Sequence, residues 1–303
     1  MLSDEKILIT GPAGQIAEPL TRALAADNEV WGIARFSDPE SRPRVESYGV
    51  TTRAIDLGRG DFGDLPRDFT YVLHLAADQA GGLDYDRALR NNAEGTGLLL
   101  EHCRTAKAAL VMSTFSVYKP SDDPEHVYTE TDPLGDVNST YAPTYSMSKI
   151  AQEGVARACA RAYNIPVVIA RMNASYGVNG GLPANHLAAA VAGQPVVTRW
   201  DPCVYSPIHE DDIFEQTEPL LAAASVPATV VNWCGDEPVS VQEWTALFGE
   251  VLGRDIEVQV GDFPGTQKSA IGDITKRLGL TGPCKVPWRD GMRHMVEARA
   301  ARR

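Results

Sequence analysis

The residues with the clearest chemical potential are a tyrosine and a lysine four positions apart, Tyr145 and Lys149. On a helix this spacing places two side chains on one face. A free tyrosine has a pKa near ~10 and is a poor base at neutral pH, but a neighbouring ammonium favours the phenolate. The pair therefore predicts proton transfer by Tyr145. Ten tyrosines and seven lysines in 303 residues give about 0.2 such pairs by chance, so the pair needs support elsewhere.

A glycine-containing turn at residues 10–17 stands between an apolar segment and a helical pattern. Glycine permits a tight turn and a close approach to a pyrophosphate, which the N–H groups and dipole of a helix N-terminus stabilise. The spacing is GxxGxxA rather than GxGxxG, and a tight turn alone would also require glycine. Its place after the first strand favours dinucleotide binding. The candidate residues are Gly11, Ala13, Gly14, Gln15 and Ile16.

The end of the next expected strand bears on the choice of dinucleotide. An acid there accepts hydrogen bonds from the ribose hydroxyls of NAD, whereas a cation attracts the 2′-phosphate of NADP. This sequence has Ala34 followed by Arg35. We therefore expect NAD(P) with NADP favoured over NAD; the alternative is that Arg35 is an ordinary surface arginine. Asp56 and Leu57 follow the third strand and are candidates for contacts with the adenine.

One cluster resembles a metal site, the run His209-Glu210-Asp211-Asp212. Its spacing is too tight for one helix face, and such aspartates commonly cap helices, so we expect no metal. The other histidines are scattered, with no HxxxH or HExxH motif. The sequence has no GxSxG motif, and no cysteine carries a recognisable nucleophile signature.

Strands and helices alternate around these residues. Apolar strands are expected at 6–10, 30–34, 71–75, 109–113 and 166–170, and helices at about 14–26, 85–106 and 143–163. This alternation predicts an α/β fold, a Rossmann-type doubly wound parallel sheet that binds ligands at the carboxyl ends of its strands.

The second half of the chain has more proline and glycine and a weaker periodicity. We expect residues 1–172 to form an NAD(P)-binding Rossmann domain to which part of 205–233 returns. Residues 173–204 and 234–303 would then form a smaller C-terminal substrate-binding portion. The acidic segment 118–141 is either a solvated loop or a lid over the substrate.

The composition excludes several classes of function. The formal net charge is -12, so the mean field of the chain repels nucleic acid and anionic membranes. No apolar run approaches the ~20 residues of a membrane span, and the N-terminus has no signal-peptide pattern. Five cysteines without a CxxC pair indicate reduced thiols in a cytoplasmic protein.

Several short motifs occur in a fixed order. They are the glycine turn, Asp56-Leu57, His74-Leu75-Ala76-Ala77, Asn92-Ala93-Glu94-Gly95-Thr96, Ser113-Thr114-Phe115-Ser116-Val117-Tyr118, Tyr145 to Lys149, and Ser206-Pro207-Ile208-His209-Glu210-Asp211-Asp212. In this order and spacing the chain resembles an extended short-chain dehydrogenase/reductase of the NAD-dependent epimerase/dehydratase superfamily.

The resemblance implies roles for individual residues. Tyr145 would be the catalytic acid/base, Lys149 would hold the nicotinamide ribose, and Thr114 would bind the reacting oxygen, with Ser113 as a substitute. Asn92 matches the family's helix asparagine and would be a catalytic and cofactor-binding residue, although a purely structural hydrogen bond would also explain it. Further cofactor residues implied are Leu75, Ala76 and Ala77, and substrate residues are Ser113, Ser116, Asn173, Asn185 and Tyr205. A homodimer through the helices near 85–106 and after Tyr145 is also implied.

On this resemblance we expect an NAD(P)-dependent oxidoreductase that acts on a secondary alcohol or ketone of a small molecule, which is the first of three functions considered. The second is a nucleotide-sugar epimerase, in which the hydride leaves and returns without net redox change. The third is a non-catalytic dinucleotide sensor, which would not need Tyr145, Lys149 and Thr114 together.

The sequence departs from the family's nucleotide-sugar pattern at two positions. Ala174 stands where such members carry an asparagine near the diphosphate, and Tyr205 stands where they carry an arginine. Phe115 and Ser116 replace the Asp-Glu of sugar 4,6-dehydratases. Since burying a diphosphate without its cationic partner is costly, we expect a substrate that is not a nucleotide sugar but a smaller or more apolar hydroxy or keto compound. Against this expectation, Arg171 or Arg199 could supply a charge.

Overall fold

The computed structural model describes residues 2–79, 82–137 and 142–301, and the chain divides into two compact units. Unit 1 comprises Met1–Val117, Tyr141–Arg171 and Phe214–Val231. Unit 2 comprises Tyr118–Thr140, Met172–Ile213 and Asn232–Arg303. Compared with the expected domain ranges, segment 118–140 groups with unit 2, and the segment that returns to unit 1 is 214–231.

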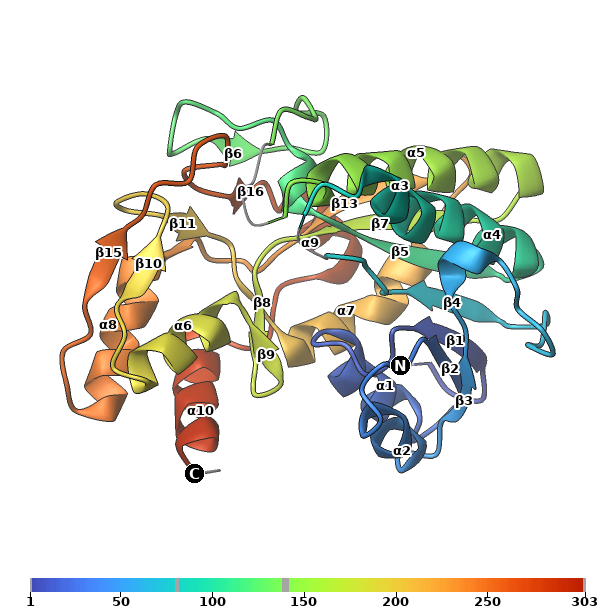
Figure 1. Ribbon diagram of the computed structural model, residues 1–303, viewed down its shortest axis with the longest axis horizontal. Coiled ribbons are helices and arrows are strands. Elements are labelled where there is room, and N and C mark those ends of the chain that lie inside the picture. The colour runs from blue at the N-terminus through green and yellow to red at the C-terminus, as the bar shows by residue number, and fades with distance from the viewer. Residues whose placement is uncertain (1, 80–81, 138–141, 302–303) are drawn as a thin grey trace. The chain divides into compact units, whose positions relative to one another are not determined.

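A seven-stranded sheet forms the centre of unit 1. Its strands are β1(Lys6–Thr10), β2(Glu29–Ala34), β3(Thr51–Ala54), β4(Tyr71–His74), β5(Ala108–Thr114), β7(Val167–Met172) and β13(Thr229–Trp233). They lie in the order β13-β7-β5-β4-β1-β2-β3, and β1 pairs in parallel with both β2 and β4 (Figure 1). The order therefore reverses between β1 and β4, which is where doubly wound sheets open a ligand crevice.

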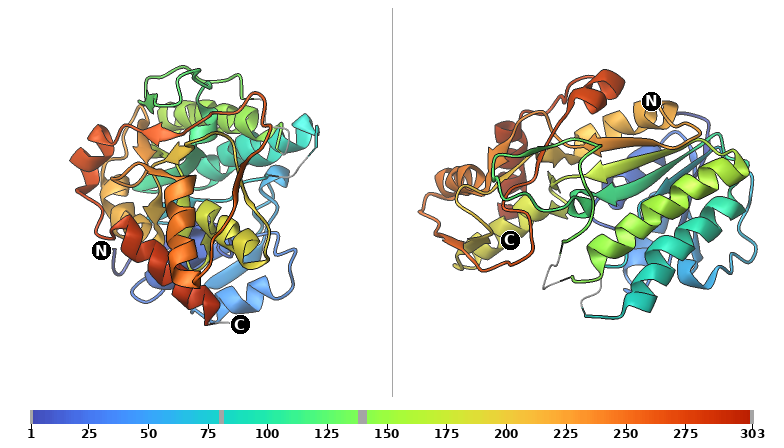
Figure 2. Two further views of the ribbon diagram at one scale, coloured as in Figure 1. Left: turned by 90° about the vertical axis from the view of Figure 1, so that its left-hand side faces the viewer. Right: turned by 90° about the horizontal axis from the view of Figure 1, so that it is seen from above.

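Helices cover both faces of this sheet. They are α1(Ala17–Leu24), α2(Ser41–Glu46), α3(Tyr85–Leu89), α4(Gly95–His102), α5(Tyr145–Tyr163) and α7(Glu210–Ala222), with short turns η1(Leu57–Arg59), η2(Arg90–Glu94) and η3(Phe115–Val117). Helices α4 and α5 lie side by side over one face (Figure 2), whereas α1 and α7 lie on the other (Figure 1). The doubly wound α/β fold expected from the sequence is confirmed.

The core of unit 1 forms where apolar strands meet the inner faces of α4 and α5. Leu8, Val72 and Val111 of the sheet are fully buried against Leu99 of α4 and Ala156 of α5. Strands buried on both faces need apolar residues in sequence, which is the pattern that predicted them. This rigid layer holds the carboxyl ends of β1, β4 and β5 in place.

The structure differs from the expected helices at two places. The predicted helix 85–106 is divided by the π-helical turn η2, which contains the buried Asn92. Such turns often mark functional sites. Helix α1 begins at Ala17 rather than near Gly14, because residues 11–16 form the turn that precedes it.

Unit 2 is built from short strands and several helices. They are β6(Val127–Tyr128), β8(Ser175–Gly177), β9(Gly180–Gly181), α6(Leu182–Val191), β10(Val196–Thr198), β11(Val204–Tyr205), β12(Ile208–His209), β14(Val239–Ser240), α8(Val241–Leu252), β15(Val258–Val260), β16(Ile271–Gly272), α9(Thr275–Thr281) and α10(Trp288–Ala300). The segment expected to be a loop or lid is anchored in this unit, since β6 pairs in parallel with β16. Its residues 138–141 lie outside the described residues.

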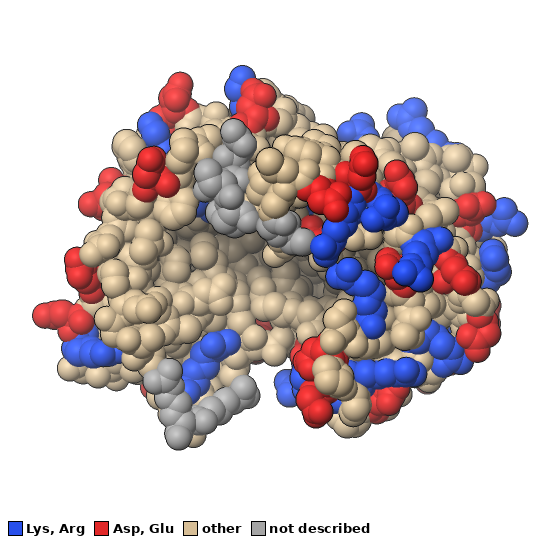
Figure 3. All heavy atoms as spheres, in the orientation of Figure 1, with Lys and Arg blue, Asp and Glu red and all other residues tan. Residues whose placement is uncertain are grey.

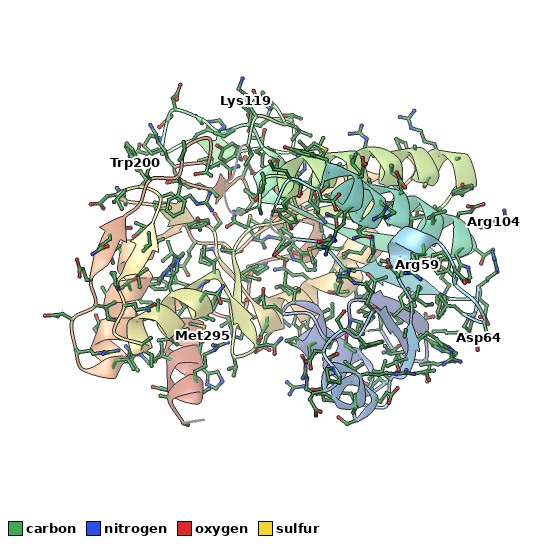
Figure 4. All side chains as sticks on the ribbon, in the orientation of Figure 1. Arg59, Asp64, Arg104, Lys119, Trp200 and Met295 are labelled. Atoms are coloured by element: carbon green, nitrogen blue, oxygen red, sulfur yellow. The ribbon has the colours of Figure 1, made fainter. Side chains whose placement is uncertain are left out.

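The surface of unit 1 mixes both signs of charge. Basic and acidic side chains are interspersed on the right of Figure 3, and Arg42 pairs with Glu46 at 2.9 Å. Arg53 pairs with Asp64, labelled in Figure 4, at 3.1 Å. Within the described part of the chain, none of the helices has the length and apolarity that crossing a bilayer requires.

Candidate active site

A cleft of about 450 Å³ opens in unit 1 beyond the carboxyl ends of β1, β2 and β4. Its lining includes every residue expected to bind the cofactor in the first 92 positions: Gly11, Ala13, Gly14, Gln15, Ile16, Arg35, Asp56, Leu57, Leu75, Ala76, Ala77 and Asn92. The lining also includes residues that the sequence did not indicate, among them Phe36, Ser37, Ser41 and Asn91. The cleft lies at the reversal of strand order, as expected for a dinucleotide site.

Gly11 shapes the floor of this cleft. Its φ is +65°, and its N–H donates to the carbonyl of Ile33 at 2.8 Å. A Cβ at Gly11 would lie 3.2 Å from the Cα of Ala76. The turn and the close approach of two backbones therefore both require glycine.

The N-terminus of α1 follows the glycine turn and is a candidate for binding an anion. No side-chain hydrogen bond caps α1 among the described residues, and Gly14 donates to the Gly11 carbonyl at 2.8 Å. An uncapped helix N-terminus after a glycine turn suits a pyrophosphate. The open cradle at Gly11 and the uncapped helix together fit a dinucleotide cofactor.

Arg35 is exposed and lines the cleft just after β2. The lining residues from Ile33 to Ser41 include no acid. Asp56, at the end of the third strand, accepts from the Gly58 N–H at 3.1 Å and so caps η1. Its other oxygen lies 3.9 Å from Arg59, an exposed side chain labelled in Figure 4.

A buried hydrogen-bond chain fixes the backbone behind the cleft. Thr10 Oγ1 accepts from the N–H groups of Leu75 and Ala76, at 3.0 and 2.9 Å, so it donates its own proton to His74 Nδ1 at 2.8 Å. The proton of His74 is therefore on Nε2, which donates to Thr96 Oγ1 at 2.7 Å. Burial lowers the pKa of His74 to about 3, which keeps this neutral form at pH 7.

Asn92 makes structural hydrogen bonds, which were the alternative explanation for this residue in the sequence analysis. Its side chain accepts from the Asp78 N–H at 2.7 Å and donates to the Asp78 carbonyl at 3.0 Å. It also donates to Ser148 Oγ at 2.9 Å, and Ser148 donates to the Tyr145 carbonyl. Asn92 thus connects the loop after β4 to the first turn of α5.

Lys149 is buried in α5, with 1% of its surface exposed. Its ammonium donates to the Met112 carbonyl of β5 at 2.6 Å. Burial lowers the pKa of Lys149 to about 7, and the nearby Glu153 carboxylate opposes part of this change. Lys149 can therefore exist in both protonation states near neutral pH.

The end of β5 carries the two candidates for contact with a reacting oxygen. Thr114 is half-buried, whereas Ser113 is buried and donates to Glu153 Oε1 at 2.6 Å. The hydroxyl of Ser113 is therefore engaged inside the core, which leaves Thr114 as the better placed of the two candidates. Tyr145 is half-buried at the first residue of α5, and Ser146 next to it donates to the Ser116 carbonyl at 2.6 Å.

The expected substrate residues of the second half all lie in unit 2. The amide of Asn173 donates to the Ala270 carbonyl and accepts from the Ser206 N–H, at 2.7 and 3.1 Å. These bonds give Asn173 a structural role in unit 2. Asn185 is exposed on α6.

Tyr205 is buried in an aromatic and cationic group of unit 2. Its ring lies 5.8 Å from that of Trp244, and the guanidinium of Arg199 lies 5.6 Å from its centroid. Trp244 in turn donates to His186, the neighbour of Asn185, at 3.2 Å. An arginine side chain therefore lies beside Tyr205, the residue that stands where the sequence pattern lacks an arginine.

In the cluster of His209, Glu210 and the following aspartates, carboxylate groups accept hydrogen bonds from backbone N–H groups. Asp212 accepts from the N–H groups of Lys285 and Val286 at 2.6 and 3.3 Å, and Glu210 accepts from Val178 at 3.1 Å. Across the residues that the structure describes, no three histidine, cysteine or acidic side chains gather as a metal site.

Sequence reasoning missed Glu153 and its buried ion pair with Arg171, which the sequence analysis had considered only as a charge for the substrate. Two signals for them were present. Glu153 follows Lys149 by four residues and so shares its helix face. Arg171 lies near the end of an apolar strand, and a buried arginine needs a carboxylate partner.

Comparisons with known proteins agree with this geometry. The family model of the NAD dependent epimerase/dehydratase family matches residues 7–200. The dTDP-glucose 4,6-dehydratase 1 of Escherichia coli (strain K12) is 28% identical over 203 residues, 57% of this chain and 55% of that protein. A dTDP-glucose 4,6-dehydratase of Salmonella typhimurium is also 28% identical over 203 residues, with the same coverage. The chain thus spans about half the length of these relatives.

Solved structures match over nearly the whole chain. UDP-glucuronic acid 4-epimerase from Bacillus cereus, in complex with UDP-glucuronic acid and NAD, has a TM-score of 0.84 at 23% identity and covers 98% of this chain and 100% of that one. UDP-N-acetylglucosamine 4-epimerase from Methanobrevibacter ruminantium M1 has a TM-score of 0.84 at 21% identity and covers 100% of both chains. At these identities the similarity establishes the fold.

Proposed function

The chain belongs to the NAD-dependent epimerase/dehydratase family, and from this premise we propose that it epimerises a secondary carbinol of a nucleotide sugar without net redox change. The observation that carries the proposal is the arrangement at the end of β5. Lys149 binds the backbone two residues before Thr114, and Tyr145 lies one helical turn before Lys149. This arrangement supplies a proton acceptor, a cation that favours its phenolate, and a donor to the substrate oxygen.

The cofactor of this proposal is NAD(P), with NADP favoured because Arg35 lines the cleft where the family's NAD-binding acid would stand. Gly11, Gly14 and the N-terminus of α1 would hold its pyrophosphate. When bound, the nicotinamide supplies the acceptor and later the donor of a hydride. Lys149 would bind the nicotinamide ribose.

The chain's own residues would then control the substrate oxygen. Tyr145 accepts the proton of the substrate hydroxyl and returns it at the end of the cycle. Thr114 donates a hydrogen bond to the same oxygen, which stabilises the charge that develops there. Transfer of the hydride back to the opposite face of the carbon would give the epimer.

Epimerisation is preferred to dehydration because of the residues after Thr114. The resemblance places Asp and Glu there in sugar 4,6-dehydratases, whereas this chain has the buried Phe115 and then Ser116. Neither side chain can supply the acid or base for eliminating water. The curated relatives are named as dehydratases, and this difference from the dehydratase pattern supports epimerisation for this chain.

The nucleotide part of the substrate is supported by unit 2. Arg171 cannot serve a diphosphate, since it is buried against Glu153. Arg199 beside Tyr205 would supply the cation that Tyr205 itself lacks, with Asn185 and Trp244 nearby on α6 and α8. A bidentate guanidinium contact is the usual means of holding a diphosphate.

The second candidate is the function expected from the sequence, a net dehydrogenase of a smaller hydroxy compound, favoured by Tyr205 and Ala174 at the two departing positions. The similarity to nucleotide-sugar epimerases and dehydratases supports the epimerase alternative better than this expectation. A homodimer through the helices α3–α4 and α5 and a cytoplasmic location complete the proposal, and the five free cysteines, four of them buried, support the latter.

The test is incubation of the purified chain and NADP or NAD with UDP-, dTDP- and GDP-sugars, followed by proton NMR of the sugar and by absorbance of the reduced nicotinamide. We expect one sugar to be converted to its epimer with no accumulation of reduced cofactor. Stoichiometric reduction with a small alcohol, and no change in any sugar, would replace the proposal by the second candidate.

A further inference from the structure

Unit 1 contains an ion pair between Glu153 of α5 and Arg171 of β7 that is sealed from water. The two residues are 3% and 2% exposed. Arg171 Nε donates to one carboxylate oxygen at 2.9 Å, and a terminal guanidinium nitrogen donates to the other at 2.7 Å. A buried pair of this kind often adds no stability over apolar residues of similar size, so its presence calls for another reason.

The carboxylate of Glu153 also binds β5 near the reaction site. Ser113 Oγ donates to Glu153 Oε1 at 2.6 Å. Ser113 lies between Met112, whose carbonyl accepts from Lys149, and Thr114. Three consecutive residues of β5 thus carry the lysine contact, the carboxylate contact and the candidate for the substrate oxygen.

Glu153 is also the charge nearest to Lys149 along α5. Tyr145, Lys149 and Glu153 follow one another at four-residue steps and share a helix face. A carboxylate at this position favours the ammonium form of Lys149, which burial disfavours. Because Arg171 neutralises one negative charge, Lys149 receives only part of this support.

The other titratable groups on the surrounding elements are neutral, paired with other groups or exposed. His74 of β4 is neutral, and Arg171 of β7 is paired with Glu153. The elements packed on α5 carry Tyr85, Asp86, Arg90, Glu94 and Glu101, which are exposed, and Arg87 and His102, which bind Asp78 and the Pro66 carbonyl. Strand β5 and η3 contribute no titratable side chain.

We propose that Glu153, anchored by Arg171, is a positioning residue that favours the ammonium form of Lys149 and fixes the end of β5 that carries Thr114. This inference rests on the proposed function, since it assigns Glu153 a part in the same chemistry.

The test follows Lys149 directly in the full chain. With [13Cε]lysine labelling, the seven lysines give few signals, and the variant Lys149→Met assigns that of Lys149. We expect Glu153→Gln to lower the titration midpoint of Lys149 by one pH unit or more, a tenfold change in its proton affinity. Glu153→Asp keeps the charge and should restore a midpoint near that of the wild type.

A second variant covers the case in which Glu153→Gln fails to fold. The double change Glu153→Met with Arg171→Leu replaces the pair by apolar residues of similar size, which buried pairs often tolerate. It should fold and also lower the Lys149 midpoint. An unchanged midpoint in either folded variant would overturn the proposal.

Turnover provides the second readout. Ser113→Ala leaves the ion pair in place, so it should lower kcat about tenfold without moving the lysine midpoint; wild-type kcat would overturn the role of Glu153 at β5. The lysine titration needs no substrate. An absence of turnover on every nucleotide sugar would therefore overturn the proposed function alone, and the midpoint would still decide this inference.

Discussion

At the scale of single residues, the environment of Lys149 explains how a buried cation can serve a reaction. Its ammonium has a backbone acceptor, the Met112 carbonyl, and a carboxylate one turn away. Because burial lowers the pKa of Lys149 from 10.5 to about 7, folding is opposed while the lysine is charged. This cost is full below about pH 7 and is relieved as the pH rises from about 7 to 10.5.

The role of Tyr145 gives the first prediction. Tyr145→Phe removes the transferable proton and leaves the ring in place, so turnover should fall by the ~10²–10⁴ expected of a general acid/base. Affinity for the reduced cofactor, measured by fluorescence, should stay within about twofold of wild type, because the substitution removes only the proton-transfer role. Turnover near the wild-type value would remove Tyr145 from the mechanism.

The position of Arg35 in the cleft gives the second prediction, on the choice between NADP and NAD. A charge-assisted contact to the 2′-phosphate should favour NADP over NAD by about 1.5–3 kcal/mol. Arg35→Asp should reverse this preference, because a carboxylate repels the phosphate and accepts from the ribose hydroxyls of NAD. Fluorescence titration of both reduced cofactors checks it. Equal affinities in the wild type would mean that Arg35 is an ordinary surface residue.

At the scale of elements, the sequence predicted most of what local pattern controls. The apolar runs located β1, β2, β4, β5 and β7 to within two residues. The division of the helix at 85–106 was not predictable, since the π turn at Asn92 depends on tertiary hydrogen bonds to Asp78 and Ser148. Likewise, no local pattern pairs Glu153 with Arg171, because the sheet brings these distant residues together.

The turn after β1 gives the third prediction. Gly11→Ala places a residue at φ +65° and a Cβ 3.2 Å from Ala76, so stability should fall by about 1–2 kcal/mol or more. Gly49→Ala is the matched control, with φ +87° and open space around its Cβ. Both changes should lower the Tm, but only the first should weaken cofactor binding. Equal cofactor affinities in the two variants would contradict the role of the turn.

The buried His74 gives the fourth prediction, on how stability depends on pH. Its pKa is lowered by burial from 6.5 to about 3, so the stability that it contributes is present above about pH 6.5 and is lost as the pH falls towards 3. Each pH unit in this window should remove up to about 1.4 kcal/mol. His74→Gln should therefore flatten the dependence of unfolding free energy on pH, measured by urea unfolding between pH 7 and 4. A slope equal to that of the wild type would show that His74 does not titrate on unfolding.

At the scale of the whole molecule, the two units divide the proposed work. The cofactor cleft, Tyr145, Lys149 and Thr114 belong to unit 1, whereas Asn185, Arg199 and Tyr205 belong to unit 2. Cofactor affinity measured alone therefore reports on unit 1. Binding of UDP, dTDP or GDP to the cofactor-loaded chain reports on unit 2, and Arg199→Met should abolish it while leaving the cofactor bound.

The outer face of α5 gives the last prediction, on the assembly of two chains. Met147 and Ala151 are half-buried and Gly154, Ala158 and Ala162 are exposed, and all five recur at three- or four-residue steps, so they share one face. Small side chains allow two helices to approach closely, and a two-fold dimer would bring the same face of a second chain against this one. Sedimentation equilibrium should give a dimer for the wild type and a monomer for Ala158→Glu, because the interface would bury an unpaired carboxylate. Ala26→Glu, at another exposed alanine of unit 1, should remain dimeric. A wild-type chain that stays monomeric at all concentrations, or a dimeric Ala158→Glu, would exclude α5 as the interface.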